Sequence, residues 1–391
     1  MSRRGYDPRA VRGARYVLAA AFAAAWLAGF AAAPAGASAR PDQFGVAGSD
    51  RMHALRPGEL ARELDGMAAV GARWLRFDID WRTIQAGGRN HFDWARFDAV
   101  VRGARLRGIN VLGIIVSTPA WARPAGTSDK RPPTDAADYA RFAGAVARRY
   151  ARFGAHHWQI WNEPNVERFW QPKPSVAGYA RLLEAAYAAI KRADPRAVVV
   201  SGGTAPSWSD GTNISPIDFA QGLYSSGAGR FFDALAHHAS TFPAFPSETP
   251  VWSAWYQMTG TSPSIRSVMA ANGDAAKPVW ITEFGAPTST GRAVSEATQA
   301  AMLRDAYRLL GSYRWAGPLF WYAYRDRRSG PLDWEDFCGL VRNDFSPKPA
   351  YAAYRALTAA ARSQFRPSVA IGSSALRAGR PATPEPVRAA D

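Results

Sequence analysis

The chain alternates short apolar runs with longer stretches in which apolar residues recur every three or four positions. Most of the short runs are almost continuously apolar and rich in Val, Ile and Trp, which is typical of parallel strands buried on both faces. There are eight of them, at residues 44–48, 74–81, 109–117, 157–163, 197–202, 232–238, 278–285 and 317–324.

Amphipathic stretches lie between these runs and predict helices. In 94–107, 136–151 and 177–193 the apolar residues fall on one helical face, and the intervening Arg, Glu and Asp face water. Eight strands, each followed by a helix, predict an α/β fold of the (β/α)8 TIM-barrel type. An open, doubly wound sheet is the alternative, but "GVAGSD" after the first strand is not the Gly-rich fingerprint that it would use.

Two glutamates stand at the ends of predicted strands. Glu163 lies in "QIWNEPN" and Glu283 in "VWITEFG", on the fourth and seventh runs. In a barrel the carboxyl ends of the strands carry the active site, so both side chains can reach one cleft. Glycoside cleavage needs such a pair, one to protonate the leaving oxygen and one to act on the anomeric carbon, and a retaining mechanism needs carboxyls about 5–5.5 Å apart.

The segments that carry these glutamates resemble the clan A retaining glycoside hydrolases, in particular the cellulase-like family 5 and the family 39 group, which includes bacterial exopolysaccharide endoglycosidases. The resemblance covers most of residues 41–360. It implies that Glu163 is the general acid/base and that Glu283 is the nucleophile. It also implies sugar contacts by Trp121 of "TPAW" and Trp321 of "LFWYAY", for which packing in the barrel core is the alternative. It aligns Arg76 of "WLRFDIDW" with the clan's second-strand arginine.

Three polar residues complete the predicted site. Arg76 can hydrogen-bond the carboxylate of Glu283 and keep it ionised, and Asn162 can hold a sugar 2-hydroxyl. His238 aligns with a His of the clan's sixth strand, but Ser240 stands where the clan often has a Tyr. Either another aromatic residue, such as Tyr256, serves in its place, or the nucleophile is tuned differently.

Charge and composition narrow the possible partners. The net charge is +16, from 48 Lys and Arg against 32 Asp and Glu. A coding bias toward Arg and Ala is one interpretation, and an anionic partner such as an acidic polysaccharide is the other. No nucleic-acid-binding motif, metal-ligand spacing or phosphate loop occurs, so we expect no nucleic acid, no metal and no other cofactor. The one cysteine, Cys338, cannot form an internal disulfide and is expected in the core.

The ends of the chain differ from its body. Residues 1–39 combine basic, apolar and small-residue segments typical of a secretory signal peptide cut after Ala39, and an uncleaved membrane anchor is the alternative. We expect a catalytic domain over 40–363 and a disordered tail over 364–391.

The sequence therefore predicts a monomer that is secreted or lies in the periplasm or cell envelope. Once the signal peptide is cleaved, we expect no association with the membrane. Its predicted activity is retaining hydrolysis of O-glycosidic bonds in a polysaccharide. A non-catalytic carbohydrate-binding or envelope protein on the same barrel is the alternative.

Overall fold

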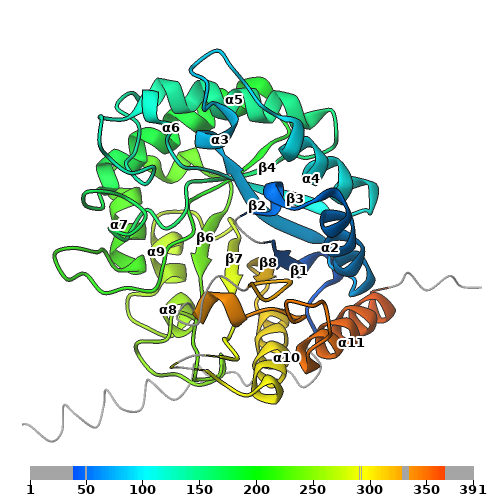
Figure 1. Ribbon diagram of the computed structural model, residues 1–391. Helices are drawn as coiled ribbons and strands as arrows, with labels where there is room; N and C mark the ends of the chain where they lie inside the picture. Colours follow the sequence, from blue (N-terminus) through cyan, green and yellow to red (C-terminus); the bar gives the residue numbers. More distant parts are fainter. Residues whose placement is uncertain (1–37, 49–50, 290, 292, 328–333, 366–391) are drawn as a thin grey trace, which may run out of the picture.

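Eight parallel strands form a nearly closed barrel surrounded by helices (Figure 1). The structure, a computed structural model, describes residues 38–48, 51–289, 291, 293–327 and 334–365. The strands pair in the order β5-β4-β3-β2-β1-β8-β7-β6, and β5 and β6 meet through two isolated parallel bridges, Val200 with Ala234 and Thr204 with His237. This confirms the predicted (β/α)8 TIM barrel and excludes the open sheet.

The strands coincide with the eight predicted apolar runs. They are β1 (Phe44–Ala47), β2 (Trp74–Asp80), β3 (Asn110–Val116), β4 (His157–Ile160), β5 (Val198–Val200), β6 (Leu235–His238), β7 (Val279–Phe284) and β8 (Ala316–Trp321).

Helices follow the strands and cover the outside of the barrel. The α-helices are α2 (Pro57–Ala69), α3 (Trp81–Ile84), α4 (Ala95–Leu106), α5 (Ala136–Ala151), α6 (Val176–Ala193), α7 (Pro216–Ser225), α8 (Tyr256–Thr259), α9 (Ile265–Ala271), α10 (Glu296–Ser312) and α11 (Pro349–Gln364). Short 3-10 turns occur at Pro41–Gln43, Met52–Ala54, Ala120–Ala122, Ala228–Phe231 and Trp334–Phe337.

Local sequence explains where the long helices begin. Asp135, Ser175 and Ser295 each accept a hydrogen bond from a backbone N–H in the first turn of α5, α6 and α10. Such caps satisfy amides that have no partner within the helix. The apolar stripes of these helices pack on the outer face of the sheet and bury the main hydrophobic core.

A second, smaller core fills the inside of the barrel. Side chains alternate between the two faces of a strand, so every second residue points inward. Trp74 of β2, Trp280 of β7 and Phe320 of β8 meet there, with Trp74 and Trp280 ring centres 5.2 Å apart. This aromatic layer supports the polar residues that follow on the same strands, toward their carboxyl ends.

The predicted chain ends fall largely outside the described residues. The expected signal segment lies in residues 1–37 apart from Ser38 and Ala39. The expected tail lies in 366–391 apart from Gln364, the last residue of α11, and Phe365. Within the described ranges, no helix is both long and apolar enough to cross a bilayer. Cys338 is buried, as predicted.

Candidate active site

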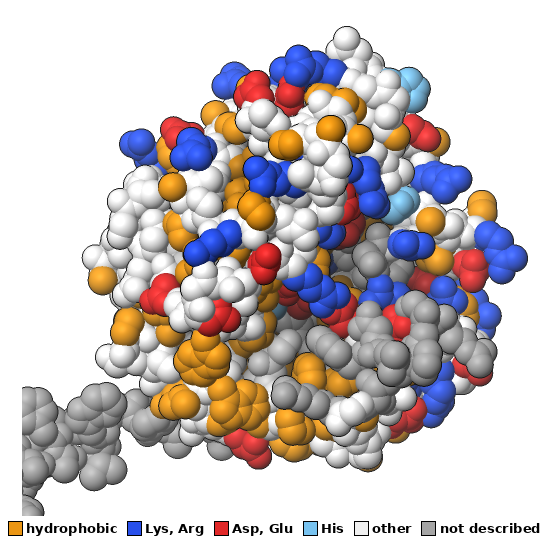
Figure 2. Space-filling view, turned by 60° about the vertical axis from the view of Figure 1, so that its left-hand side comes forward, with side chains coloured by type: hydrophobic (Ala, Val, Ile, Leu, Met, Phe, Trp, Pro, Cys, Tyr) orange, Lys and Arg blue, Asp and Glu red, His pale blue; other side chains and the backbone are white. Residues whose placement is uncertain are grey.

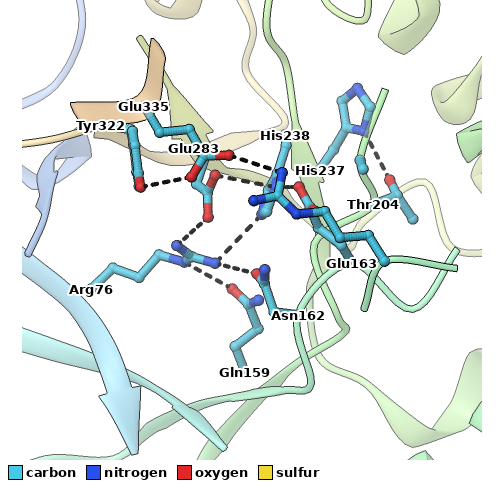
Figure 3. Close-up of polar contacts among 12 residues, drawn as sticks. Arg76, Gln159, Asn162, Glu163, Thr204, His237, His238, Glu283, Tyr322 and Glu335 are labelled. Carbon is cyan, nitrogen blue, oxygen red and sulfur yellow. Dashed lines mark hydrogen bonds and ion pairs between the residues drawn. The ribbon is translucent and has the colours of Figure 1, made fainter. Parts of the chain in front are cut away.

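The two predicted catalytic glutamates face each other at the carboxyl ends of the strands (Figure 3). Glu283 is on β7, and Glu163 follows β4 by three residues. One carboxylate oxygen of each, together with a ring nitrogen of His238, lies within 4.8 Å of the other two atoms. Both carboxylates keep some access to solvent, with side chains 16% and 22% exposed for Glu163 and Glu283 respectively. The structure thus brings together two glutamates that are 120 residues apart in the sequence.

The chain takes an unusual backbone path into Glu163. Trp161 and Glu163 have φ of 67° and 46°, in the left-handed region that side chains other than Gly seldom adopt. Contacts with the next loop hold this turn, because the N–H of Glu163 donates to the Gly203 carbonyl at 3.0 Å. The Asn165 side chain is fully buried and is hydrogen-bonded to the N–H and carbonyl groups of Ala205. The "WNEPN" segment therefore fixes the direction of the Glu163 side chain.

Arg76 connects the polar residues at the bottom of the site. Its Nη1 donates to Glu283 Oε1 at 2.6 Å and its Nη2 donates to Asn162 Oδ1 at 2.8 Å. Its Nε donates to Gln159 Oε1 at 3.3 Å. Arg76 is only 4% exposed, so its charge acts on Glu283 with little screening by water.

His238 lies between the two glutamates. Its Nδ1 is 2.8 Å from Glu163 Oε1 and 3.5 Å from Glu283 Oε2. The preceding residue, His237, is hydrogen-bonded to Thr204 and to the Ala254 carbonyl, and burial lowers its pKa to about 4. His237 is thus a neutral residue with both ring nitrogens hydrogen-bonded, and it fixes the end of β6. His238, in contrast, contacts both glutamates.

The electrostatic environment favours ionised Glu283. Burial raises the pKa of the Glu283 carboxyl, but the neighbouring His238 and Arg76 outweigh burial and hold the pKa below its ordinary value. A carboxylate that stays ionised is suited to act as a nucleophile.

The same cluster offers carboxylate and imidazole ligands of the kind that bind metal ions, on Glu163, His238 and Glu283. However, the Arg76 guanidinium already donates to Glu283. Its fixed positive charge opposes a cation at this position. The arrangement is better suited to proton transfer and nucleophilic attack.

Arg76, Asn162, Glu163 and Glu283 line a cleft of about 130 Å³. Figure 2 shows one face of the molecule that is hollowed near its middle, with basic and acidic side chains around the hollow. The cleft is lined by Gly48, Arg76, Phe77, Asp78, Ile114, Lys130, Asn162, Glu163, Phe169, Glu283, Tyr322 and Glu335.

Three predicted sugar contacts lie away from this lining. Trp321 is fully buried in the outer core and its Nε1 donates to the Cys338 carbonyl. Trp121 donates to the Gln85 carbonyl and packs edge-on against Trp81. Tyr256 begins the short helix α8, where its ring lies against Gly260.

Tyr322, which the sequence reasoning missed, takes the aromatic place in the cleft. Phe320 points into the barrel, and strand alternation places Trp321 outward and Tyr322 inward again. The Tyr322 hydroxyl accepts from Arg327 at 2.9 Å and donates to Glu335 at 3.4 Å. The strand's period of two is the signal that could have identified it.

Comparisons with known proteins agree with this fold. The family model described as Cellulase (glycosyl hydrolase family 5) matches residues 52–321. A search of the curated proteins finds no match. Solved structures with a similar fold include a family 39 glycoside hydrolase from Bacteroides cellulosilyticus WH2, at 22% identity and a TM-score of 0.65. The alignment covers 82% of this chain and 64% of that one, so the chain spans less than two thirds of that protein's length.

Two further similar structures are more distant in sequence. A GH5_18 protein from Streptomyces cattleya, solved in complex with GlcNAc, is 18% identical with a TM-score of 0.65, and the match covers 84% of this chain and 82% of that one. A glucosidase from Croceicoccus marinus is 16% identical with a TM-score of 0.61, over 83% and 68% of the two chains. At these identities the likeness shows a common fold.

Proposed function

The chain belongs to glycosyl hydrolase family 5, and from this premise we propose that it is a retaining glycosidase that cleaves O-glycosidic bonds of a polysaccharide. The observation that carries the proposal is the pair Glu163 and Glu283, with oxygens within 4.8 Å across one cleft. Retaining enzymes hold their carboxyls close together, because one of them bonds directly to the sugar and no water has to fit between.

The first step forms a covalent glycosyl-enzyme. A Glu283 carboxylate oxygen attacks the anomeric carbon while the bond to the leaving oxygen breaks, and Glu163 gives its proton to that oxygen. In the second step Glu163 removes a proton from water, whose oxygen attacks the anomeric carbon and releases Glu283. Glu163 ends protonated and Glu283 ionised, as they began.

The neighbouring residues support these roles. Asn162 Oδ1 accepts from Arg76, so the amide nitrogen of Asn162 is left to donate to a sugar hydroxyl. Arg76 and His238 stabilise the charge of Glu283 before attack, and the same Nδ1 atom of His238 also contacts Glu163. A hydrogen bond to the sugar 2-hydroxyl that strengthens in the transition state contributes several kcal/mol in such enzymes.

The product's configuration tests the mechanism. We expect NMR of the first-formed product to show the same anomeric configuration as the substrate, on at least one member of a polysaccharide panel. Glu163→Gln and Glu283→Gln should each lose activity by about 100-fold or more. Glu184→Gln, on the exposed side of α6, is the matched control and should retain it. An inverted product would reject the proposed mechanism, and sugar binding without turnover would favour a non-catalytic carbohydrate-binding protein.

The proposal includes export. Residues 1–39 have the basic, apolar and small-residue order of a signal peptide. Cleavage after Ala39 would leave Arg40 as the first residue, and the side chain of Arg40 donates to the Ala316 carbonyl at the start of β8. N-terminal sequencing of the protein from the culture medium or periplasm should begin at Arg40. An intact N-terminus in the membrane fraction would instead support an anchor.

A further inference from the structure

An aromatic ring flanked by two cations lines the wall of the cleft beside the catalytic glutamates. Phe169, in the loop between β4 and α6, is half-buried and shares the cleft lining with Glu163 and Glu283. Lys130 Nζ lies 5.2 Å from the centre of the Phe169 ring, and the guanidinium carbon of Arg168 lies 5.2 Å from the same centre. Lys130 is itself a lining residue.

The backbone around Lys130 is anchored. The Lys130 carbonyl accepts from the N–H of Gln171 at 3.1 Å, and the Lys130 N–H donates to Ser128 Oγ. Ser128 Oγ in turn donates to Gln171 Oε1 at 2.6 Å. These bonds join the loop after β3 to the loop after β4, so Lys130 is held beside Phe169 before any ligand binds.

The cations of the cleft differ in what they already bind. Arg76 is engaged by Glu283, Asn162 and Gln159, and Arg168 is 3.3 Å from Glu335. The ammonium of Lys130 has neither an ion pair nor a hydrogen bond to any residue in the described ranges, and it lies over the ring of Phe169. A half-buried ammonium beside an aromatic face is suited to an anionic ligand that also carries an apolar surface.

Resting on the proposed glycosidase function, we propose that Lys130 and Phe169 form a subsite for an acidic sugar unit of the polysaccharide. Phe169 packs against the C–H face of the sugar, and Lys130 donates to its carboxylate. Three carboxylates of the lining already have partners of their own: Glu283 is paired with Arg76, Glu335 with Arg168, and Glu163 is bonded to His238. The net charge of +16 adds a long-range attraction for an acidic polymer.

The test compares substrates that differ only in the carboxylate. The probes are uronic-acid oligosaccharides prepared from polygalacturonate, alginate and hyaluronan, each alongside its carboxyl-reduced neutral form. For each pair, kcat/KM is measured by reducing-end release and Kd by calorimetry. We expect the unmutated protein to favour an acidic probe over its reduced form, and this preference should weaken as ionic strength rises.

Lys130→Met should lower kcat/KM and binding for that acidic probe by about 10-fold to 100-fold, with less than about a twofold change on its reduced form. Lys173→Met is the matched control, because Lys173 is an exposed lysine in the loop that contains Phe169, and it should change neither. An equal loss on both forms, or failure of the unmutated protein to bind any acidic probe, overturns the proposal.

Binding and turnover separate this proposal from the function on which it rests. Lys130-dependent binding of an acidic probe without hydrolysis would support the subsite and reject the glycosidase. Hydrolysis of neutral probes that Lys130→Met leaves unchanged, with no preference for an acidic form, would support the glycosidase and reject the subsite.

Discussion

Arg76 and Glu283 are 207 residues apart in sequence, and their side chains meet with Nη1 2.6 Å from Oε1. The pair joins β2 to β7 across the interior of the barrel. Since the arginine is buried, its hydrogen bond fixes the direction of the proposed nucleophile as well as its charge.

Replacing Arg76 with Met should therefore change the pH profile as well as the rate. Without the arginine, only His238 of these two neighbours still opposes the effect of burial, so the pKa of Glu283 rises and the fraction of ionised nucleophile at acidic pH falls. We expect the acid limb of kcat/KM to move up by about one pH unit or more, and the rate at neutral pH to fall at least about tenfold. Arg73→Met, at an exposed position just before β2, should leave both unchanged. An unmoved acid limb would mean that Arg76 does not set the ionisation of the nucleophile.

Azide should distinguish the two glutamates. With an activated aryl glycoside, the leaving group needs little protonation, so Glu163→Ala should still form the glycosyl-enzyme. Azide should then restore turnover and give a glycosyl azide of retained configuration, because the small anion attacks without help from a base. The same anion should give an inverted product with Glu283→Ala. Product analysis by NMR decides this, and rescue of neither variant would contradict the assigned roles.

Gly203 allows His238 to approach the glutamates. A Cβ on Gly203 would lie 2.3 Å from His238 Nε2 and 2.7 Å from Thr282 Oγ1, so Gly203→Ala must move one of these neighbours. We expect kcat/KM to fall by about 10-fold to 100-fold, because small displacements of catalytic groups are costly. Gly58→Ala, where an added Cβ meets no atom within 4 Å, is the control. Wild-type kinetics for Gly203→Ala would show that the position of His238 is unimportant.

Trp321 and Tyr322 are neighbours, but we expect replacement of Trp321 to lower stability and replacement of Tyr322 to lower activity. Trp321→Ala should lower the free energy of unfolding by about 3–5 kcal/mol, because it leaves a cavity in the outer core. Tyr322→Phe removes a cleft hydroxyl bonded to Arg327 and Glu335, and should lower kcat/KM several-fold while changing stability by about 1 kcal/mol or less. Urea unfolding and steady-state kinetics on both variants test this. A large loss of stability in Tyr322→Phe, or an unchanged free energy of unfolding in Trp321→Ala, would contradict the two assignments.

Periodicity was sufficient to predict the barrel, because each strand is a distinct apolar run and each long helix has a regular stripe. The strand count also placed Glu163 and Glu283 together, since the carboxyl ends of parallel strands meet at one edge of the barrel, whereas His238 came from the resemblance to the clan.

The structure places Trp321 in the core, the alternative to the expected sugar contact, because a shift of one residue along the strand exchanges the core face for the cleft. Lys130, Phe169 and Glu335 stand in long loops. The direction of a loop side chain depends on contacts such as the one between Lys130 and Gln171, which have no sequence period.

The aromatic layer of Trp74, Trp280 and Phe320 has a kinetic consequence. These side chains are at most 7% exposed and pack inside the barrel beneath Arg76, so the site is approached from the mouth. Under the proposed two-step reaction, the water that releases the sugar would enter by the route through which the first product leaves. A leaving saccharide that lingers would therefore delay hydrolysis and stay positioned to attack the glycosyl-enzyme itself. Bond synthesis should then compete with hydrolysis as the concentration of acceptor sugar increases.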